Sequence, residues 1–404
     1  MISVAEALAK VVQGVSRVSS EQVPLAAALG RVLAEDVASR VSHPPAAVSA
    51  MDGYAVRAAD VKDPPATLTR IGESAAGARF EGAIGKGECI RIFTGAPLPE
   101  GADAVVIQED TSTDGDAVTM KEAAIPGRFV RPQGLDFAAG EVLLSAARVL
   151  TARDVGLAAA MNVPWLLVRR RPRIAFAATG DEVMMPGDPL GPDQIVSSNS
   201  LALGAYVRAL GGQPVNLGIA RDTEESLRQV LAGARGADLL VTTGGASVGD
   251  YDLVTKVLGA EGLDLGFYKV AMRPGKPLIF GRLGDVPVLG LPGNPVSTAV
   301  TAVIFLKAAI EEMLGIRTDA DAAATAVLGR DLRANDERQE YLRAVTSLDA
   351  DGNLVATPFE KQDSAMLTRL AEADCLVVRA PGAPAAKKGD RVAIIPLGQG
   401  TVLF

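Results

Sequence analysis

The sequence predicts a multidomain protein that combines an α/β domain with β-rich regions before and after it. Between Pro172 and Leu314, short apolar segments alternate with helical patterns, which is typical of a doubly wound, mostly parallel sheet. Short apolar segments separated by Gly and Pro fill residues 46–145 and 320–404, which indicates β structure. A length of 404 residues fits two to four domains.

The residues before the α/β domain divide into a helical part and a β-rich part. We expect helical structure over residues 2–40, where apolar side chains recur at helical spacing, at Val4, Leu8 and Val11. An extended region follows, in which we expect short strands over 89–93, 104–107 and 117–120. A helix is expected over 151–162, because Thr151 can cap it and Asp154 lies near its first turn.

The α/β domain has the clearest alternation of strand and helix. Its expected strands cover residues 174–178, 215–219, 239–241, 267–272, 277–280 and 286–289. Its expected helices cover residues 198–210, 223–234, 252–258 and 295–314. Beyond them, short strands over 340–345, 354–357, 375–378 and 391–395 suggest a small barrel or a sandwich.

The composition limits the environment in which the protein works. Hydrophobic residues make up 48% of the chain and charged residues 22%, as in a soluble globular protein with sizeable cores. The formal net charge of −8 argues against broad nucleic-acid binding, which needs a basic face. The amino terminus has no basic signal-peptide region, and the most apolar stretch, 296–306, is too short to cross a bilayer. We therefore expect a cytoplasmic protein that does not bind membranes.

The few cysteine and histidine residues argue against several chemistries. Cys89 and Cys375 lie far apart and neither belongs to a C-x-x-C pair, so we expect no disulfide framework or zinc site. His43 is the single histidine, and we interpret it as a loop residue rather than as a member of a catalytic triad. A metal would have to be held by carboxylates and substrate oxygens, which favours Mg²⁺.

The stretch 240–252, LVTTGGASVGDYD, has the pattern of a ligand loop at the end of a buried strand. Ligands of α/β folds bind at the carboxyl ends of the strands. Glycines let the backbone approach an anion closely, and the first turn of the next helix can help to hold it. Asp250 and Asp252 add oxygen ligands suited to Mg²⁺ beside a phosphate, although such glycine-rich strand ends can also be simple tight turns.

Four strand ends of this domain carry acids or glycines, and parallel strands should bring them to one edge of the sheet. The acids are Glu182, Asp222, Asp250 and Asp252. Carboxylates crowd unfavourably unless a cation offsets them, so Arg273 and Lys276 are candidates to supply that charge and to hold phosphate. Each acid could instead cap a helix or occupy its first turn, although four in one domain favour a shared site.

The first half of the chain adds three candidates in loops. Asp52 could be a catalytic acid or a turn-forming residue, and Thr94 could bind an oxyanion or merely cap a strand end. Asp136 follows Arg131 in a loop, where the two could serve a site or form a solvated salt link. The basic run RRRPR at 169–173 is expected to be a solvated linker at a domain junction rather than a nucleic-acid site.

Six motifs along the chain occur in an order that resembles the molybdopterin molybdenumtransferases, the molybdenum insertases that include the E domain of gephyrin. They are SAMDGYAV (49–56), FTGAPLP (93–99), ATGDEV (178–183), TGGASVGDYD (243–252), RPGKP (273–277) and LPGNPVS (291–297). The resemblance covers essentially the whole chain, and six motifs in order are far more specific than any one of them.

The resemblance implies an activity and its participants. The activity is the final step of molybdenum cofactor assembly, in which adenylylated molybdopterin and molybdate are converted, with Mg²⁺, to molybdenum cofactor and AMP. Family members are homodimers whose cleft lies between the α/β domain of one subunit and the first half of the other. Further implied partners are a molybdopterin adenylyltransferase and the apo-molybdoenzymes.

The resemblance also implies how the chain divides into domains. An elongated helical linker domain takes residues 1–45 and 140–171, and a β-rich domain of residues 46–139 is inserted into it. An α/β molybdopterin-binding domain takes residues 172–318. A small C-terminal β-barrel takes residues 319–404.

The family's site positions carry over residue by residue. Implied catalytic positions from the first half are Asp52, Thr94 and Asp136, and the acidic cluster matches Glu182, Asp222 and Asp252. The metal would be held by Asp222 and Asp252. Implied molybdate contacts are Arg273, Lys276, Arg343 and Ser364, with Lys276 also catalytic and with Arg273 where the family frequently has Lys. Implied substrate and nucleotide contacts are Thr179, Gly180, Asp181, Gly244, Gly245, Ser247, Gly249, Asp250, Pro292, Gly293, Asn294, Pro295 and Ser297.

Two alternatives stand beside this interpretation. The α/β domain also resembles the molybdopterin adenylyltransferase, which uses ATP on free molybdopterin but is a single-domain protein without the SAMDGYAV motif. A scaffold that anchors a partner protein is the second alternative. The acids and the basic pair retained in the sequence count against a purely structural role.

Overall fold

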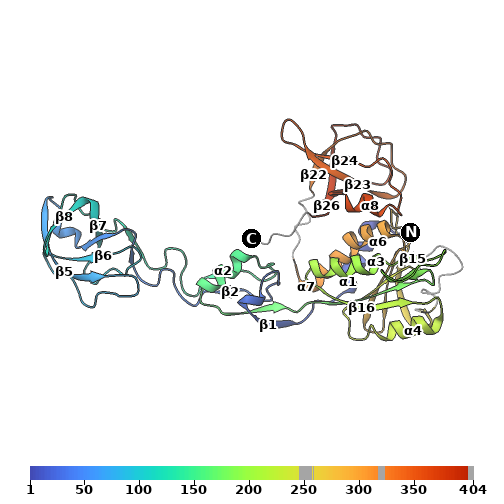
Figure 1. Ribbon diagram of the computed structural model, residues 1–404, viewed down its shortest axis with the longest axis horizontal. Helices are drawn as coiled ribbons and strands as arrows, with labels where there is room; N and C mark the ends of the chain where they lie inside the picture. The colour runs from blue at the N-terminus through green and yellow to red at the C-terminus, as the bar shows by residue number, and fades with distance from the viewer. Residues whose placement is uncertain (245–256, 258, 317–323, 399–404) are drawn as a thin grey trace.

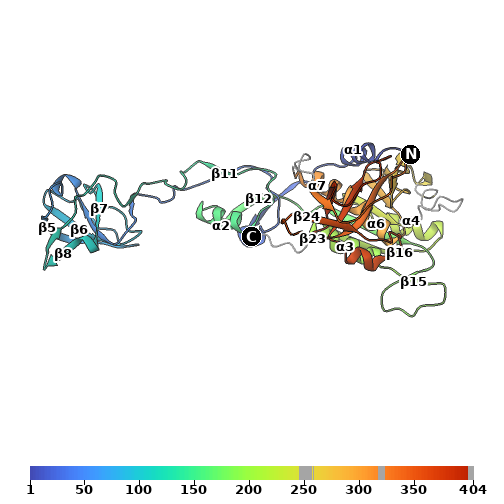
Figure 2. The same cartoon turned by 90° about the horizontal axis from the view of Figure 1, so that it is seen from above.

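The molecule is elongated, with a body at one end and an arm that carries a separate domain at the other end (Figures 1 and 2). The computed structural model describes residues 1–244, 257, 259–316 and 324–398. We call residues 19–170 the arm and the remaining described residues the body. The chain leaves the body and returns to it side by side, because β1 (Ser20–Pro24) pairs antiparallel with β12 (Trp165–Arg169).

A six-stranded sheet forms the centre of the body. Its strands lie in the order β16 (Gln213–Ala220), β13 (Arg173–Thr179), β17 (Leu239–Thr243), β21 (Val286–Leu291), β20 (Ile279–Leu283) and β18 (Leu263–Tyr268). The first four strands are parallel, and the last two form an antiparallel edge. The predicted mostly parallel sheet is confirmed, and the carboxyl ends of four strands meet at one edge.

Successive side chains of the central strands face two different cores, as a doubly wound sheet requires. Ile174 and Phe176 lie in one core and Ala175 in the other, because strand side chains alternate between the two faces. The first core also receives helices α1 (Val4–Gly14), α3 (Asn199–Ala209), α6 (Pro295–Thr301) and α7 (Lys307–Leu314). The second core receives α4 (Glu224–Ala232).

The long helix predicted over 295–314 is confirmed, with a π-helical segment over Ala302–Leu306 between α6 and α7. The π-helical segment buries Phe305 and Leu306 in the first core of the body. The helical run from α6 to α7 therefore packs on the sheet without a break. None of the helices in the described part of the chain has the length and hydrophobicity needed to cross a bilayer.

The helix predicted over residues 2–40 is confirmed only as far as Gly14. The helix α1 begins after Ser3, whose hydroxyl accepts a hydrogen bond from the amide of Glu6, and it packs into the α/β core rather than into the arm. Beyond it the prediction is wrong, because β1 pairs with β12 from far along the chain. Such long-range pairing overrides local helical spacing.

The part of the arm nearest the body is a small mixed unit with its own core. Helix α2 (Ala152–Ala160) starts as predicted, with a reciprocal capping box between Thr151 and Asp154. A short pair of strands, β2 (Val37–Ala38) and β11 (Val142–Leu144), contributes Val37 and Leu144 to the same core. The core is filled by aliphatic side chains, among them Val23, Leu33, Leu144, Leu150, Met161 and Leu166.

The far end of the arm is the distal domain, a six-stranded sheet around a separate core. Its order is β7 (Ala104–Ile107), β4 (Gly53–Val56), β6 (Glu88–Ile92), β5 (Ala66–Ser74), β9 (Ala117–Met120) and β8 (Thr111–Asp114). A second, short pair joins β3 (Val48–Ser49) to β10 (Val130–Arg131). The strands predicted over 89–93, 104–107 and 117–120 are therefore confirmed.

The last domain is a closed barrel, so of the predicted barrel and sandwich the barrel is confirmed. Its ring runs β23 (Gln339–Leu348), β24 (Leu354–Pro358), β22 (Thr325–Leu328), β26 (Arg391–Pro396) and β25 (Cys375–Arg379), and β25 pairs back with β23. Outside the ring, β19 (Met272–Arg273) pairs in parallel with β23. Helix α8 (Leu367–Ala371) lies between the barrel and α6 (Figure 1).

Gly53 of the SAMDGYAV motif is required by packing of the distal sheet. A Cβ at this position would lie 2.0 Å from the carbonyl oxygen of Val106 in the neighbouring strand β7. We expect Gly53→Ala to destabilise the distal domain by at least about 2 kcal/mol, because backbone rather than a flexible side chain must move. Hydrogen exchange of the β4 and β7 amides would measure the change.

Gly156 gives the matched control, since it is exposed in α2 and a Cβ there would meet nothing within 4 Å. Gly156→Ala should leave the distal domain unaffected and stabilise the helix by about 0.5–1 kcal/mol. Unchanged amide exchange in Gly53→Ala would contradict the assigned role of this glycine.

Candidate active site

The four parallel strand ends of the body are joined to one another by hydrogen bonds. The Thr179 hydroxyl donates to the carbonyl of Thr243 at 3.4 Å, which connects β13 with β17. The Gly180 amide donates to the carbonyl of Ala220 at 3.2 Å, and the Gly244 amide to that of Leu291 at 3.3 Å. The predicted convergence of these loops is thus present in the described residues.

Acidic side chains gather at the β13 and β16 ends of this edge. Asp181, Glu182 and Asp222 are all exposed. The Asp181 carboxylate accepts a hydrogen bond from the amide of Asp222 at 3.3 Å, and the Arg221 guanidinium donates to the carbonyl of Asp181 at 3.2 Å. Five other candidates lie outside the described residues: Gly245, Ser247, Gly249, Asp250 and Asp252.

Two glycines let three loops approach one another at this edge. A Cβ at Gly244, whose φ is +90°, would lie 2.9 Å from the carbonyl oxygen of Thr179. A Cβ at Gly293 would lie 3.4 Å from the Cα of Gly244. The side chain of Asn199 donates to the Gly293 carbonyl at 2.7 Å, which fixes the LPGNP loop against helix α3. This close packing leaves backbone groups, rather than side chains, at the centre of the edge.

The barrel reaches the same edge through Ser364. The Asn294 amide group donates to the Ser364 hydroxyl at 2.9 Å, and the Val296 backbone amide donates to the Ser364 carbonyl at 3.2 Å. Pro295 occupies the first turn of α6, and Ser297 is buried behind it. The Pro292 carbonyl accepts from the Thr298 hydroxyl at 2.6 Å. The structure thus brings together Ser364 and the predicted LPGNPVS residues.

Arg343 is buried in the barrel, with 1% of its surface exposed. Its guanidinium donates to the Gln362 side chain and to the carbonyls of Asp363 and Met366, at 3.0 to 3.2 Å. Burial lowers the pKa of this guanidinium, since no carboxylate bonds to it directly. In this conformation Arg343 supports the loop that carries Ser364.

Arg273 links the body sheet to the barrel. Its guanidinium forms ion pairs with Glu340 and, at 3.1 Å, with Asp336, and it donates to the Asn335 side chain at 3.3 Å. The β19–β23 pairing positions this contact. Lys276, half-buried three residues later, has no ion pair with any other described residue. The two members of the predicted basic pair therefore have different surroundings.

In the distal domain, the structure brings Asp52 and Thr94 together. The Asp52 carboxylate accepts from the Thr94 amide at 2.7 Å and from its hydroxyl at 2.8 Å. These hydrogen bonds, with the amide contributing most, lower the pKa of Asp52. Asp136 is exposed in the loop after β10, and its amide donates to the His43 carbonyl at 3.0 Å.

Arg91 and Asn199 are site neighbours that the sequence analysis did not single out. The Arg91 guanidinium lies over the rings of Tyr54 and Phe93, 5.2 and 5.0 Å from their centroids, and donates to the Gln108 side chain at 2.6 Å. Arg91 on β6 and Phe93 just after the strand are two residues apart, and this spacing of a cation and an aromatic ring was a usable signal. Asn199 has no comparable signal, because its contact with Gly293 depends on the tertiary fold.

The two groups of candidates do not meet within one chain. The distal domain, which carries Asp52 and Thr94, lies at the opposite end of the molecule from the acidic edge of the sheet (Figures 1 and 2). A site that used both groups would need a second molecule.

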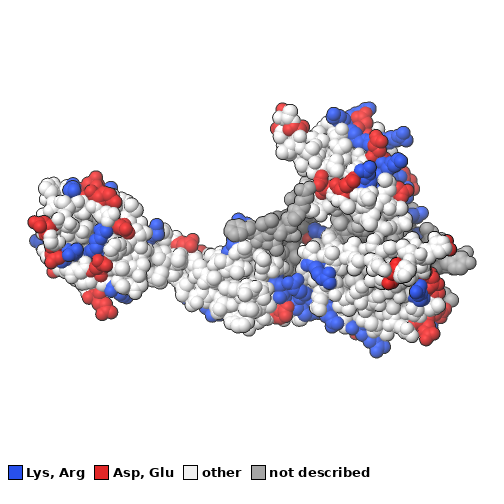
Figure 3. Space-filling view, viewed as in Figure 1, with Lys and Arg blue, Asp and Glu red and all other residues white. Residues whose placement is uncertain are grey.

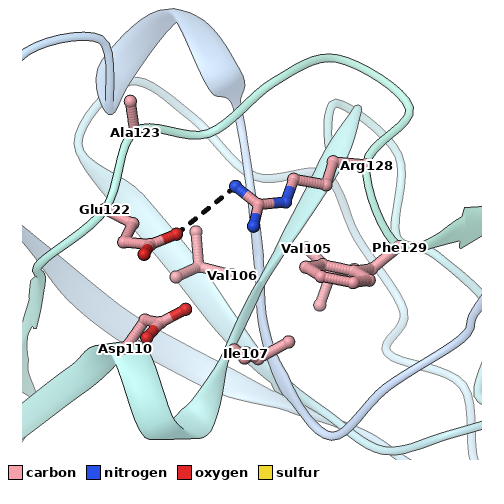
Figure 4. Close-up of a pocket in the computed structure, with 8 residues that line it drawn as sticks. All are labelled: Val105, Val106, Ile107, Asp110, Glu122, Ala123, Arg128 and Phe129. Atoms are coloured by element: carbon pink, nitrogen blue, oxygen red, sulfur yellow. Dashed lines mark ion pairs between the residues drawn. The ribbon is translucent and has the colours of Figure 1, made fainter.

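A cavity in the distal domain is too small to hold a substrate. It measures about 10 Å³, roughly the room for a single water. Figure 4 shows Arg128 extending over it, paired with Glu122 at 3.4 Å and stacked on Phe129 at 5.0 Å. Arg128 and Glu122 compensate each other, and the small volume leaves no room for a ligand beside the Asp110 carboxylate.

The acidic edge has the donor chemistry that Mg²⁺ requires. Among the described residues no group of three or more His, Cys, Asp or Glu side chains is close enough to form a complete metal site. Mg²⁺ does not need such a group, because it commonly binds one or two carboxylates together with waters and substrate phosphates. The exposed Asp222 and Glu182 fit that mode.

We expect Asp52 to titrate below 3.8, because the Thr94 hydrogen bonds favour its ionised form. The folded pKa is lowered, so the resulting stabilisation is present above 3.8 and is lost as the pH falls through the folded value. In Thr94→Val the pKa of Asp52 should rise part of the way towards 3.8, because the hydrogen bond from the backbone amide of residue 94 persists. NMR titration of the Asp52 carboxyl would measure this. Thr94→Ser should restore the wild-type midpoint, and an unchanged value in Thr94→Val would contradict the role of the hydroxyl.

Comparison with known proteins places the whole architecture in one family. Residues 2–162 match the MoeA N-terminal region (domain I and II), residues 175–312 a probable molybdopterin binding domain, and residues 325–397 the MoeA C-terminal region (domain IV). The molybdopterin molybdenumtransferase of Nostoc sp. is 38% identical, covering 81% of this chain and 77% of its own length. That of Bacillus subtilis is 33% identical, covering 98% and 94%.

Solved structures agree with these sequence matches. A molybdopterin biosynthesis MoeA protein from Pyrococcus horikoshii superposes with a TM-score of 0.87 at 31% identity, covering 99% of this chain and all of the other. A second structure from Pyrococcus horikoshii OT3 gives a TM-score of 0.83 at 27% identity, covering 98% and 99%. The chain therefore belongs to the molybdopterin molybdenumtransferase, or MoeA, family, a family of transferases with a role in molybdenum cofactor biosynthesis.

Proposed function

We propose that this protein inserts molybdenum from molybdate into adenylylated molybdopterin and releases AMP, giving molybdenum cofactor. The named relatives support a molybdopterin substrate. The observation that carries the proposal is the sheet edge at which acids, closely packed glycine loops and Ser364 of the barrel come together. Such an edge suits a ligand with a phosphate group, because glycine loops allow close approach and exposed carboxylates beside them can hold Mg²⁺.

In this proposal the acidic edge binds the phosphate side of the substrate. Asp222, together with Asp252, would hold Mg²⁺, which polarises a phosphoryl group and offsets its charge. Glu182 would orient the pterin nucleotide or a water, and Asp181 keeps Asp222 in place through its backbone amide. The glycine loops, with Thr179, Gly180 and Gly244, would contact the nucleotide.

The molybdate substrate would lie between the basic pair and the barrel. Lys276 is the better candidate for direct contact, because it has no ion pair with any other described residue. Arg273 would contribute positive charge while it holds the barrel through Asp336 and Glu340. Arg343 would act by supporting the loop that presents Ser364.

The reaction as proposed needs no thiol from the protein, because the dithiolene of the substrate supplies sulfur ligands to molybdenum. Both cysteines are buried. Burial raises the pKa of Cys89 to about 12 and that of Cys375 to about 11. They therefore stay protonated at neutral pH, when a thiolate would be the reactive form.

We further propose that the working unit is a homodimer. The acidic edge of one protomer would face the distal domain of its partner, which contributes Asp52, Thr94 and Asp136. The separation of the two groups within one chain supports this arrangement (Figure 2). We also propose that the protein works in the cytoplasm. There it would bind a molybdopterin adenylyltransferase, which supplies its substrate, or an apo-molybdoenzyme, which receives its product.

The activity can be tested directly with purified protein. Addition of molybdate to protein, Mg²⁺ and adenylylated molybdopterin should release AMP, and omission of molybdate should suppress the release. Consumption of ATP with free molybdopterin would instead identify an adenylyltransferase. Absence of AMP release from folded protein would contradict the proposal and favour a scaffold.

Mixing two inactive variants tests the shared cleft. Asp52→Ala and Asp222→Ala should each lose AMP release, whereas a mixture that exchanges subunits should recover about a quarter of wild-type activity. Half of the dimers would then be mixed, and each would hold one intact cleft. The AMP assay after subunit exchange is the measurement.

The matched control mixes Asp222→Ala with Glu182→Ala. Both changes lie at the same sheet edge, so no mixed dimer contains an intact cleft and activity should stay absent. Recovery in this control, or none in the Asp52 and Asp222 mixture despite subunit exchange, would contradict a cleft built from two chains.

A further inference from the structure

A pocket lies where the arm joins the body. It is at the amino ends of β13 and β16, and the candidate active site is at the carboxyl ends of the same strands. We call it the joint pocket; it is lined by Glu21, Arg170, Arg171, Arg173, Gln213 and Gly236. Arg173 begins β13 and Gln213 begins β16, whereas the acidic edge lies at the other ends of these strands. The joint pocket is therefore separate from the candidate active site.

The size of the joint pocket suits a small ligand. Its cavity volume of about 440 Å³ falls in the range of about 300–1,000 Å³ that small-molecule sites occupy. Glu21 comes from β1 of the arm, and Gln213 and Gly236 come from the body. A ligand here would contact both parts of the molecule at the point where they meet.

Only some of the charges around the joint pocket compensate one another. Arg170 forms two parallel hydrogen bonds of 2.7 Å with Asp238, whose carboxylate also accepts the Arg173 backbone amide at 2.7 Å. Glu21 is engaged by the buried guanidinium of Arg31. Both nearby carboxylates are therefore occupied by other groups.

Arg171 and Arg173 carry the uncompensated charge. Both side chains are exposed, and neither guanidinium forms an ion pair with another described residue. In a protein of net charge −8, this local excess of positive charge is unusual and creates a field that attracts anions. Figure 3 shows Lys and Arg side chains gathered where the arm meets the body.

We propose that the joint pocket binds a multiply charged anion of the phosphate type. Two guanidinium groups can each present a planar pair of N–H donors to phosphate oxygens, a geometry that favours phosphate over a simple halide. The exposed Gln213 adds a neutral donor at the pocket wall. The bound anion sits between Arg171 and Arg173 of the body, next to Arg170 and Glu21 at the end of the arm.

Calorimetric titration with inorganic pyrophosphate tests the proposal. The double variant Arg171→Gln/Arg173→Gln should bind pyrophosphate at least about tenfold more weakly than the wild type, because two charge-assisted contacts are lost. The variant should remain folded, since both side chains are exposed and the Arg173 backbone bonds persist. Thermal unfolding of the variant checks this.

Two controls separate the joint pocket from other anion sites. Arg153→Gln removes an equally exposed arginine from α2 and should leave pyrophosphate binding unchanged. Lys276→Gln should leave unchanged the binding component that the double variant loses, because Lys276 lies in the candidate active site and not in the joint pocket. Wild-type affinity in the double variant, or a loss confined to Lys276→Gln, would overturn the proposal.

Inorganic phosphate and ADP distinguish the sources of the phosphate groups. Binding of pyrophosphate and ADP with similar affinity, both lost in the double variant, supports recognition of the phosphates alone. Tighter binding of ADP that is lost in the same variant supports a nucleotide as the occupant. Binding of all three anions unaffected by the double variant counts against the pocket as their site.

Discussion

Parallel pairing of β13 with β16 and β17, and of β17 with β21, is the constraint on which the candidate active site depends. Parallel strands must end at the same edge, so the sheet brings together loops from distant parts of the sequence, and hydrogen bonds such as that from Thr179 to Thr243 then join them. The glycine packing between Gly244 and Gly293 then sets how closely the loops approach. The barrel depends on the same sheet, because its Ser364 contacts the loop that follows β21.

Elements with a strong local pattern could be predicted from the sequence. Alternation identified the parallel strands, Thr151 and Asp154 identified the start of α2, and the four strand ends identified the acidic edge. The helix predicted over residues 15–40 is absent for a physical reason. Strand β1 forms its hydrogen bonds with β12, which is distant in sequence and is brought near only by the fold. Closure of the barrel likewise depends on the pairing of β25 with β23, which no local pattern encodes.

The surroundings of the basic candidates could not be predicted for a related reason. A sequence identifies a positive charge but not its partner. Arg273 meets Asp336 and Glu340 only because β19 pairs with β23, and Arg343 meets loop carbonyls only because the barrel buries it. Motif matching predicts a site role for all three residues, whereas the contacts distinguish Lys276 from two arginines that also hold structure together.

The buried state of both cysteines has a practical consequence for following the chemistry. Alkylating reagents react with thiolates, and neither Cys89 nor Cys375 supplies an accessible one in the folded protein. A substrate that carries a dithiolene would then be the main alkylatable species in a native reaction mixture. Its sulfurs could be labelled over time without a competing signal from the enzyme, and their protection from label would report when metal occupies them.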